Sequence, residues 1–354
     1  MSAPENYARA GIQAMAGYAP GEQLAGRRII KLNTNECPYP PSPAAGEAAR
    51  AFDWTALNRY PDPTARALRE EAAALYGFTP DEVICGNGSD DLLTIALRTF
   101  VDAGAPFAYP EPSYSLYPVL ADLQGALKIP FQLEDDFSLN AASVLRQCRG
   151  ARLLILACPN APTGNVFSAE ELRKLCAGFA GVVWIDEAYA DFAEGNCLSF
   201  VHDYPNVVVS RTFSKSYALA GLRLGLAFAP RALIAEMNKL KDSYNVDRFA
   251  QTVGAAALAD QAYLRSTVGK IRAERERAAA FFNGCGCRVL PSQANFIMVR
   301  PARANAADLY AALRNEGILV RYFPLPRISE YLRITVGTPE QMDELYAAFR
   351  RLDR

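Results

Sequence analysis

One segment of the chain places a lysine among hydroxyl side chains and ahead of an arginine. Residues 210–223 read SRTFSKSYALAGLR, with Lys215 near the centre. A partly buried lysine with positive neighbours can lose its charge and form a Schiff base with an aldehyde. Taken alone, a solvated loop lysine is the simpler interpretation, so the chemical assignment depends on the residues placed around Lys215.

Two other polar residues follow apolar runs that are typical of buried strands. Asp186 comes directly after residues 182–185, and Asn160 lies in a Pro/Gly-rich turn after residues 153–157. Ligands of α/β proteins bind at the carboxyl ends of such strands. Residues 85–91 form a glycine-containing turn before an apolar helix, whose first N–H groups could bind phosphate, although an ordinary loop is an alternative interpretation.

Histidine is the usual proton carrier near neutral pH, and this chain contains only one. His202 stands before Asp203-Tyr204-Pro205, a pattern typical of a surface turn. One histidine cannot build a multi-histidine metal site, and the eight cysteines include no CxxC pair. We therefore expect no bound metal, and we expect a lysine or a cofactor to perform the acid-base chemistry.

Charge and hydropathy indicate a small-molecule partner. The 37 Lys and Arg residues nearly balance the 38 Asp and Glu residues, so no broad field favours nucleic acid or an anionic membrane. Residues 1–9 lack the pattern of a secretory signal, and no apolar run is long enough to span a bilayer. These features predict a cytoplasmic protein that binds neither nucleic acid nor membrane.

Short apolar runs alternate with helical stretches between residues 64 and 230. This alternation predicts an α/β fold with a large, mostly parallel, seven-stranded sheet. The predicted strands are 83–85, 107–109, 127–131, 153–157, 182–185, 207–210 and 224–229.

The composition changes after Asp247 to a stretch rich in Ala, Arg and Glu, which predicts one long helix to about residue 282 that links two domains. A smaller α+β unit follows, with predicted strands 295–300, 318–321 and 331–336 and helices 304–315 and 338–351. We expect three parts: an N-terminal arm (1–30) packing with the small domain, a large ligand-binding domain (31–246), and the linking helix with the small domain (247–354).

Together these segments resemble the fold-type I, pyridoxal-phosphate-dependent aminotransferases, and most closely the histidinol-phosphate aminotransferase family. The resemblance covers nearly the whole chain, with nine motifs in the family's order. They are LNTNE (32–36), YPDP (60–63), GNGSD (86–90), PSY (112–114), PNAPTG (159–164), DEAY (186–189), SK (214–215), GLR (221–223) and YLRITVG (331–337).

The resemblance implies that the chain binds pyridoxal 5′-phosphate (PLP). Lys215 would hold the cofactor aldehyde and then carry the substrate Cα proton as general acid and base. Asp186 would pair with the pyridine nitrogen and keep it protonated. Asn160 and Tyr189 would hydrogen-bond the ring O3′, and Tyr114 would stack on the ring face.

The resemblance also implies a phosphate site and a homodimer. The groups expected at the phosphate are the backbone N–H groups of Ser89 and Asp90 and the side chains of Thr212, Ser214 and Arg223. Tyr60 matches a tyrosine that reaches the phosphate from the other subunit, which implies a homodimer with shared sites.

Two arginines are expected to select the substrates because a guanidinium binds a carboxylate or a phosphate through two hydrogen bonds. By resemblance, Arg333 takes the α-carboxylate of glutamate. Arg321 takes the glutamate side-chain carboxylate and the phosphate ester of the other substrate. Tyr18 of the arm would add a hydroxyl to that ester's site, and Asn35 and Asn160 complete the expected substrate contacts.

The implied reaction converts L-histidinol phosphate and 2-oxoglutarate to imidazole acetol phosphate and L-glutamate by a ping-pong mechanism, in histidine biosynthesis. Two other activities remain open at this stage: an aminotransferase for aromatic amino acids, and a threonine-phosphate decarboxylase. The segment Tyr244-Asn245 is a further possible substrate contact, and Arg327 has no assigned role.

Overall fold

A computed structural model of the chain describes residues 7–19, 21–23 and 28–353. Within these residues the largest sheet has seven strands in the order β2-β8-β7-β6-β5-β3-β4. Only β8 runs antiparallel to its neighbours, so the sheet is mostly parallel, as predicted. The strands are β2 (Val83–Gly86), β3 (Pro106–Glu111), β4 (Leu127–Gln132), β5 (Leu153–Ala157), β6 (Val182–Asp186), β7 (Val207–Thr212) and β8 (Gly225–Phe228).

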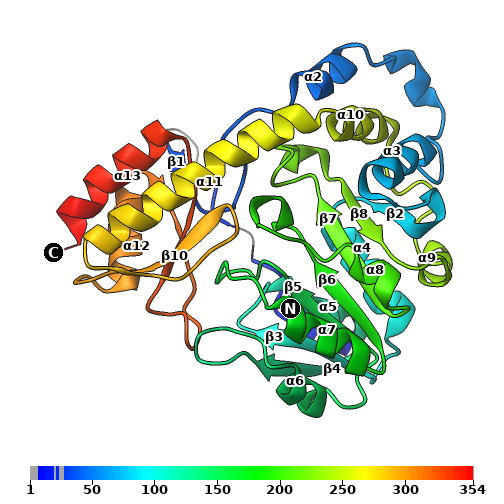
Figure 1. The fold of residues 1–354 in the computed structure, drawn as a ribbon, viewed down its shortest axis with the longest axis horizontal. Helices are drawn as coiled ribbons and strands as arrows, with labels where there is room; N and C mark the ends of the chain where they lie inside the picture. Colours follow the sequence, from blue (N-terminus) through cyan, green and yellow to red (C-terminus); the bar gives the residue numbers. More distant parts are fainter. Residues whose placement is uncertain (1–6, 20, 24–27, 354) are drawn as a thin grey trace, which may run out of the picture.

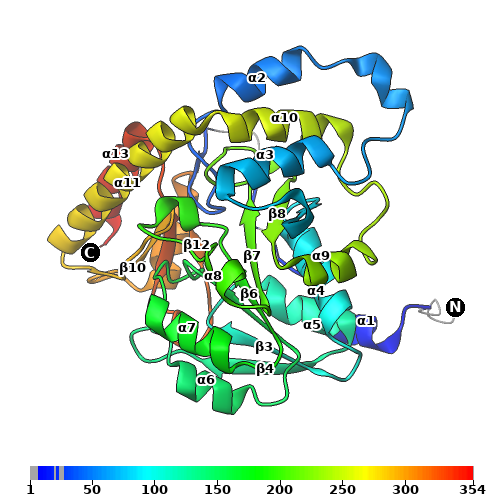
Figure 2. The same ribbon diagram turned by 45° about the vertical axis from the view of Figure 1, so that its right-hand side comes forward.

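Helices cover both faces of this sheet because its central strands bury side chains on both sides (Figures 1 and 2). Trp184 and its same-face neighbours pack with one set of helices, whereas Val183 and Ile185 pack with the other. The Trp184 face carries α4 (Ser89–Phe100), α5 (Leu116–Gln124) and α9 (Arg231–Asn238). The opposite face carries α3 (Arg66–Tyr76), α6 (Ala141–Gln147), α7 (Ala169–Gly178), α8 (Phe200–Asp203) and α10 (Arg248–Ala259).

A second core forms beside the large sheet from the C-terminal part of the chain (Figure 1). Its four-stranded antiparallel sheet has the order β12-β13-β10-β9. The elements of this unit are β9 (Arg288–Val289), β10 (Phe296–Arg300), α12 (Ala306–Asn315), β11 (Ile318–Leu319), β12 (Arg321–Tyr322), β13 (Leu332–Thr335) and α13 (Pro339–Leu352). This arrangement is the smaller α+β unit expected from the sequence.

The long linking helix expected over residues 247–282 is instead two helices, so that prediction was wrong. Asp260 ends α10, and its carboxylate accepts a hydrogen bond from the backbone N–H of Tyr263 at the start of α11 (Gln261–Gly284). An aspartate in this position caps a new helix rather than continuing the old one. Figures 1 and 2 show α11 crossing from α10 to the C-terminal unit.

The predicted strand 318–321 also divides, because its two halves pair with different sheets. Residues Ile318–Leu319 pair in parallel with β1 (Ile30–Lys31), whereas Arg321–Tyr322 pair with β13. The expected domain limits remain a proposal, and the packing refines them. Ile30 and Leu32 lie in the C-terminal core, and α11 passes from one core to the other between Ile271 and Ala278.

The described part of the predicted arm contains α1 (Ala10–Ala14) and residues up to Gln23. Glu22 forms an ion pair with Arg314 of α12, which ties this segment to the small unit. Residues 1–6, 20 and 24–27 of the arm lie outside the described residues. The remaining helical segments are α2 (Pro43–Arg50), η1 (Trp54–Asn58), η2 (Pro80–Glu82), η3 (Ala190–Phe192) and η4 (Ala220–Leu222).

Candidate active site

A cavity of about 340 Å³ lies where the two units meet. Its base is built from the carboxyl ends of three adjacent strands, which contribute Ala157 of β5, Asp186 of β6 and Thr212 of β7. The C-terminal unit contributes Arg321, Phe323 and Arg333. Further lining comes from Tyr18, Asn33, Thr34, Asn35, Glu36, Ser89, Asp90, Ser113, Tyr114, Ser115, Tyr189, Ser214, Lys215 and Arg223.

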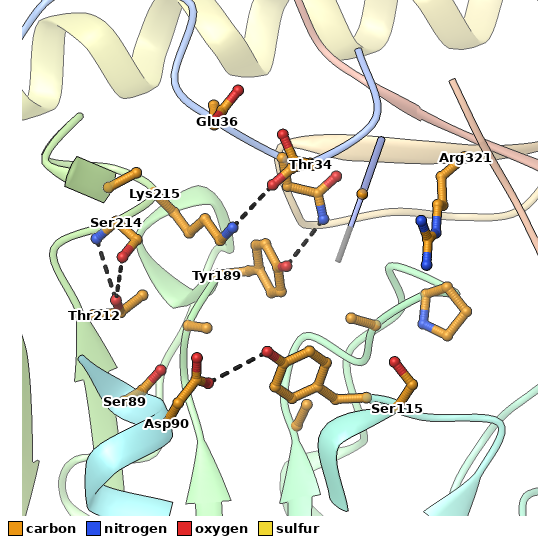
Figure 3. Close-up of a pocket in the computed structure, with 18 of the residues that line it drawn as sticks. Thr34, Glu36, Ser89, Asp90, Ser115, Tyr189, Thr212, Ser214, Lys215 and Arg321 are labelled. Atoms are coloured by element: carbon orange, nitrogen blue, oxygen red, sulfur yellow. Dashed lines mark hydrogen bonds between the residues drawn. The ribbon is translucent and has the colours of Figure 1, made fainter. Parts of the chain in front are cut away.

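Lys215 lies in the loop after β7 and points its amine into this cavity (Figure 3). Its Nζ donates to the backbone oxygen of Thr34 at 3.1 Å and lies 5.8 Å from the centre of the Tyr189 ring. Burial, together with the positive charge of Arg333, lowers the pKa of Lys215 to about 8. A lysine in this state has a larger uncharged, nucleophilic fraction near neutral pH than a lysine in water.

Asp186 ends β6 with its carboxylate almost fully buried. Tyr117 donates to Oδ2 at 3.2 Å and Ser210 donates to Oδ1 at 3.3 Å. The Ser210 oxygen in turn accepts from the indole N–H of Trp184 at 2.9 Å, which directs its own proton toward Asp186. Burial raises the pKa of Asp186 to about 6, with a further contribution from Asp90. A cationic partner would stabilise this carboxylate.

Tyr189, which is labelled in Figure 3, forms a hydrogen-bonded pair with Asn35 on the cavity wall. The Asn35 amide donates to the Tyr189 hydroxyl at 2.9 Å. Asn35 is itself fixed by Thr335, which accepts from its N–H and donates to its side-chain oxygen, both at 3.0 Å. Because Thr335 lies on β13, the small unit determines where the hydroxyl of Tyr189 stands.

Asn160 was expected to contact the ligand directly, but the structure places it elsewhere. It is fully buried in its turn and lies outside the lining of the cavity. Both hydrogens of its amide are engaged, with the backbone oxygen of Pro112 at 3.1 Å and the hydroxyl of Thr163 at 2.8 Å. Its side-chain oxygen accepts from Ser113 at 2.9 Å. In this geometry the amide hydrogens and the side-chain oxygen of Asn160 all bind protein groups. Asn160 therefore joins two loops of the site.

The start of helix α4 forms a cradle for an anion. Ser89 and Asp90 occupy the first turn, where N–H groups have no partner within the helix. Arg223 reaches the same place, with Nη1 3.3 Å from the Ser214 hydroxyl and Nη2 3.4 Å from the Asp90 carboxylate. Ser214 also pairs with the Thr212 hydroxyl at 3.1 Å (Figure 3).

Two glycines keep this cradle open. Gly88 has a φ of 85°, and a methyl group there would lie 2.6 Å from the guanidinium of Arg223. A methyl group on Gly225 of β8 would lie 2.7 Å from the backbone nitrogen of Ser89. Both positions therefore require glycine.

Aromatic rings and the two expected arginines complete the wall. Tyr114 donates to Asp90 at 3.3 Å, and Tyr18 of the arm packs edge-on against it with ring centres 5.9 Å apart. Arg333 donates to the backbone oxygen of Asn33 at 2.8 Å, and its Nε is buried without a hydrogen-bond partner among the described residues. Arg321 donates to the backbone oxygen of Ala19 at 3.2 Å.

Tyr60, Tyr244, Asn245 and Arg327, like Asn160, lie outside this cavity. Tyr60 is 74% exposed and stacks on Tyr244, with ring centres 4.3 Å apart. Asn245 donates to the backbone oxygen of Cys85 at 2.9 Å, which makes it a structural contact. Arg327, left unassigned above, donates to the backbone oxygens of Leu133 and Glu134 and so joins the small unit to the large one. The described residues bring together no cluster of metal ligands.

Sequence reasoning missed Tyr117 and Phe323. Tyr117 faces Asp186 from α5, and its position four residues from Ala121 predicts only a core residue on that helix. Phe323 lies between two arginines, with Arg321 and Arg333 at 5.4 Å and 5.3 Å from its ring centre. Neither residue belongs to a short motif, so only the folded arrangement could identify it.

The family of the chain follows from its similarity to known proteins. Residues 27–349 match the model of the aminotransferase class I and II family. The chain is 46% identical to the histidinol-phosphate aminotransferase of Synechocystis sp. over 97% of both chains, and 45% identical to that of Microcystis aeruginosa over 95% of both. This chain belongs to the histidinol-phosphate aminotransferase family.

Solved structures agree with this assignment. The crystal structure of histidinol-phosphate aminotransferase from Sinorhizobium meliloti in complex with pyridoxal-5′-phosphate has a TM-score of 0.90 to this chain, with 27% identity. The match covers 100% of this chain and 99% of the Sinorhizobium meliloti chain. Aspartate aminotransferase from Thermus thermophilus with maleate, at 20% identity and a TM-score of 0.84, shares the fold. This aminotransferase is therefore a fold-type I enzyme.

The family depends on PLP, and the cavity of this aminotransferase fits that cofactor. PLP requires an amine for its aldehyde, a carboxylate for its pyridine nitrogen and an anion site for its phosphate. Lys215, Asp186 and the cradle at the start of α4 provide these three groups around one cavity.

Among the helices of the described chain, none combines the length and the apolar character needed to cross a bilayer.

Replacing Gly225 by alanine should weaken PLP binding by about tenfold or more. The added methyl would meet Ser89 N at 2.7 Å and displace the start of α4, because overpacking against backbone costs about 1–3 kcal/mol. Titration of the variant with PLP, followed by absorbance, measures the dissociation constant. Gly221→Ala is the control because open space surrounds that position. Equal PLP affinity in the two variants would contradict the cradle.

Lys215 should react with acetic anhydride in protein stripped of cofactor, with a pH midpoint near 8, because burial lowers its pKa to about 8. The amine is charged and unreactive below that pH and uncharged above it. Arg333→Gln should raise the midpoint, since the positive charge of Arg333 also lowers this pKa.

Quantitative mass spectrometry of the labelled peptides gives both midpoints. Lys174 is the internal control, because hydrogen bonds with Glu170 and Glu171 raise its pKa. A midpoint for Lys215 near that of an ordinary exposed lysine would refute its desolvation.

Proposed function

We propose that this aminotransferase moves the amino group of L-histidinol phosphate to 2-oxoglutarate, giving imidazole acetol phosphate and L-glutamate, in histidine biosynthesis. The observation that carries the proposal is the meeting of Arg321 and Arg333 with Lys215 in one cavity. The relatives named histidinol-phosphate aminotransferase, at 45–46% identity over nearly the full chain, support it.

Within this proposal, PLP supplies an aldehyde for the substrate amine and a ring that accepts electrons. Lys215 would hold the aldehyde through Nζ and, once free of it, would move the proton at the substrate Cα. A pKa of about 8 suits both tasks, since the amine can accept and return a proton near neutral pH. Asp186 would pair with the pyridine nitrogen, and Tyr117 and Ser210 orient its carboxylate.

The other lining residues hold the cofactor in place. Ser89, Asp90, Thr212, Ser214 and Arg223 would bind the phosphate, and Tyr114 would lie against the ring. We propose that Tyr189, oriented by Asn35, donates to the ring O3′. Asn160 then acts by fixing Ser113 and the Pro112 backbone rather than by contacting the ligand itself.

The two arginines explain how one site accepts both substrates in turn. Arg333 lies half-buried against the rings of Phe296 and Phe323, and its Nε has no hydrogen-bond partner among the described residues, which suits a carboxylate near the reacting carbon. Arg321 stands farther toward the arm, where it contacts Ala19 next to Tyr18. The distal carboxylate of glutamate and the phosphate ester of histidinol phosphate would both bind there, with the hydroxyl of Tyr18.

Replacing Arg321 by glutamine should lower kcat/KM for histidinol phosphate by about 10- to 100-fold, because a charged hydrogen bond contributes about 1.5–3 kcal/mol. The measurement is the loss of the cofactor's visible absorbance on adding each amine without an acceptor, followed by its return with 2-oxoglutarate.

The same assay distinguishes the other two activities. Faster conversion by L-tyrosine would favour an aromatic aminotransferase, and release of CO₂ from phosphothreonine would favour a decarboxylase. Either result would contradict the proposed substrate while leaving the PLP site intact.

We also propose that the enzyme is a homodimer in which Tyr60 reaches the phosphate cradle of the partner. Tyr60 lies outside the cavity of its own chain and belongs to an exposed apolar ridge. The ridge consists of Trp54, Leu57, Tyr60 and Tyr244, which are 60%, 53%, 74% and 43% exposed. A cluster of large exposed apolar side chains is typical of a surface that another chain covers.

Leu57→Asp should convert a dimer to monomers and reduce PLP affinity, because a charge would be buried at the interface. Light scattering with size-exclusion chromatography measures the mass. Leu123→Asp, at a residue that is 45% exposed on α5, is the matched control and should stay dimeric. A monomeric wild type, or dissociation of both variants, would contradict this interface.

A cytoplasmic location completes the proposal. All eight cysteines are free thiols. The cytoplasm keeps thiols reduced, so this pattern suits an enzyme of that compartment.

A further inference from the structure

A buried network of charged side chains lies behind the wall of the cavity. Arg211 donates from Nε to Glu187 at 2.9 Å and from Nη1 to Asp191 at 2.6 Å. A second contact joins Arg211 Nη2 to Glu187 at 2.8 Å, so the guanidinium holds both carboxylates at once. The hydroxyl of Ser216 donates to the other oxygen of Asp191.

Three of the four members stand beside a residue of the proposed site in the sequence. Glu187 follows Asp186, Arg211 precedes Thr212, and Ser216 follows Lys215. Neighbouring residues of a strand point to opposite sides, as Arg211 and Thr212 do on β7. Asp186, Thr212 and Lys215 line the cavity, while Glu187, Arg211 and Ser216 lie outside its lining.

Most of the network is closed off from solvent on its far side, and the Asp191 side chain is 19% exposed. The side chains of Arg211 and Glu187 are only 9% and 1% exposed. The Arg211 guanidinium lies 5.4 Å from the centre of the Tyr76 ring, and the Tyr76 and Tyr217 hydroxyls are 3.1 Å apart. Glu187 also accepts from the backbone N–H of Cys197. Few alternative partners are available here, so the ion pairs fix one geometry.

We propose that Arg211, Glu187, Asp191 and Ser216 form a positioning network that holds the Lys215 loop at a fixed distance from Asp186. The inference rests on the proposed roles of those two residues. Asp186 would meet one end of the cofactor ring and Lys215 the other, yet they come from different strand ends. Arg211 on β7 contacts Glu187 and Asp191, which lie in the loop after β6. Asp191 in turn contacts Ser216, the residue that follows Lys215.

This placement affects the rate of proton transfer more than substrate affinity. No member of the network lines the cavity in the described structure, so none would lose a substrate contact when altered. A displacement of about 1 Å in a catalytic group can slow a reaction by up to about 100-fold. A buried ion pair is a weak source of stability but can specify one arrangement, which is the role assigned to Arg211.

The test compares Ser216→Ala and Arg211→Lys with Ser42→Ala in the PLP-loaded enzyme. Ser216→Ala removes one hydroxyl contact, and Arg211→Lys keeps the charge but loses the fork that binds two carboxylates. Ser42 is a buried serine that caps α2 away from the cavity, so its variant controls for lost stability. Stopped-flow absorbance with L-glutamate gives the rate of the glutamate half-reaction and the half-saturating concentration. A pH titration gives the midpoint of the cofactor's absorbance change, and thermal melting reports folding.

We expect Ser216→Ala to slow the half-reaction about tenfold and Arg211→Lys to slow it more, with half-saturating glutamate changed less than twofold. The pH midpoint should shift in both variants and stay at the wild-type value in Ser42→Ala. If Ser216→Ala and Ser42→Ala melt lower but match in rate and midpoint, the network is only structural and the inference is wrong. If the wild type shows no cofactor absorbance with PLP, the proposed function fails and the inference fails with it.

Discussion

The site depends on the burial of the amine of Lys215 at the junction of the two units. A lysine amine retains its proton in water at neutral pH, and here removal from water lowers its pKa to about 8. That environment requires both units, because Arg333 and the segment around Thr34 approach Lys215 from the side of the small core. The position of the domains relative to one another is therefore part of the chemistry.

Burial also determines the chemistry at the opposite end of the cavity, but there it raises a pKa instead of lowering it. Asp186 is a buried carboxylate whose pKa is raised to about 6, and it is held by Tyr117 and Ser210. A buried amine that is poorly charged and a buried carboxylate that needs a cation suit a ligand with an aldehyde at one end and a basic nitrogen at the other. The cradle at the start of α4 adds the third fixed point, and two glycines keep it open.

Much of this arrangement could be predicted from local patterns. The seven strands of the large sheet were identifiable because buried parallel strands form short apolar runs between helices. Asp186 and Lys215 were identifiable because they follow such runs, and the ends of neighbouring parallel strands meet at one edge. The prediction of a single long helix failed because Asp260 lies within an Ala-rich stretch. One continuous helix and two successive helices have similar composition there.

The sequence by itself determined the fold class from short-range patterns. It also indicated the candidate lysine, the carboxylate and the phosphate turn, through nine motifs in the order of one family. Only the tertiary structure decided what surrounds them. It tied the amide of Asn160 to the backbone of Pro112, brought Tyr117 to Asp186, and joined Ser216 to Arg211 through Asp191. These contacts connect residues far apart in the chain, so their partners depend on strand order and domain packing, which no local spacing encodes.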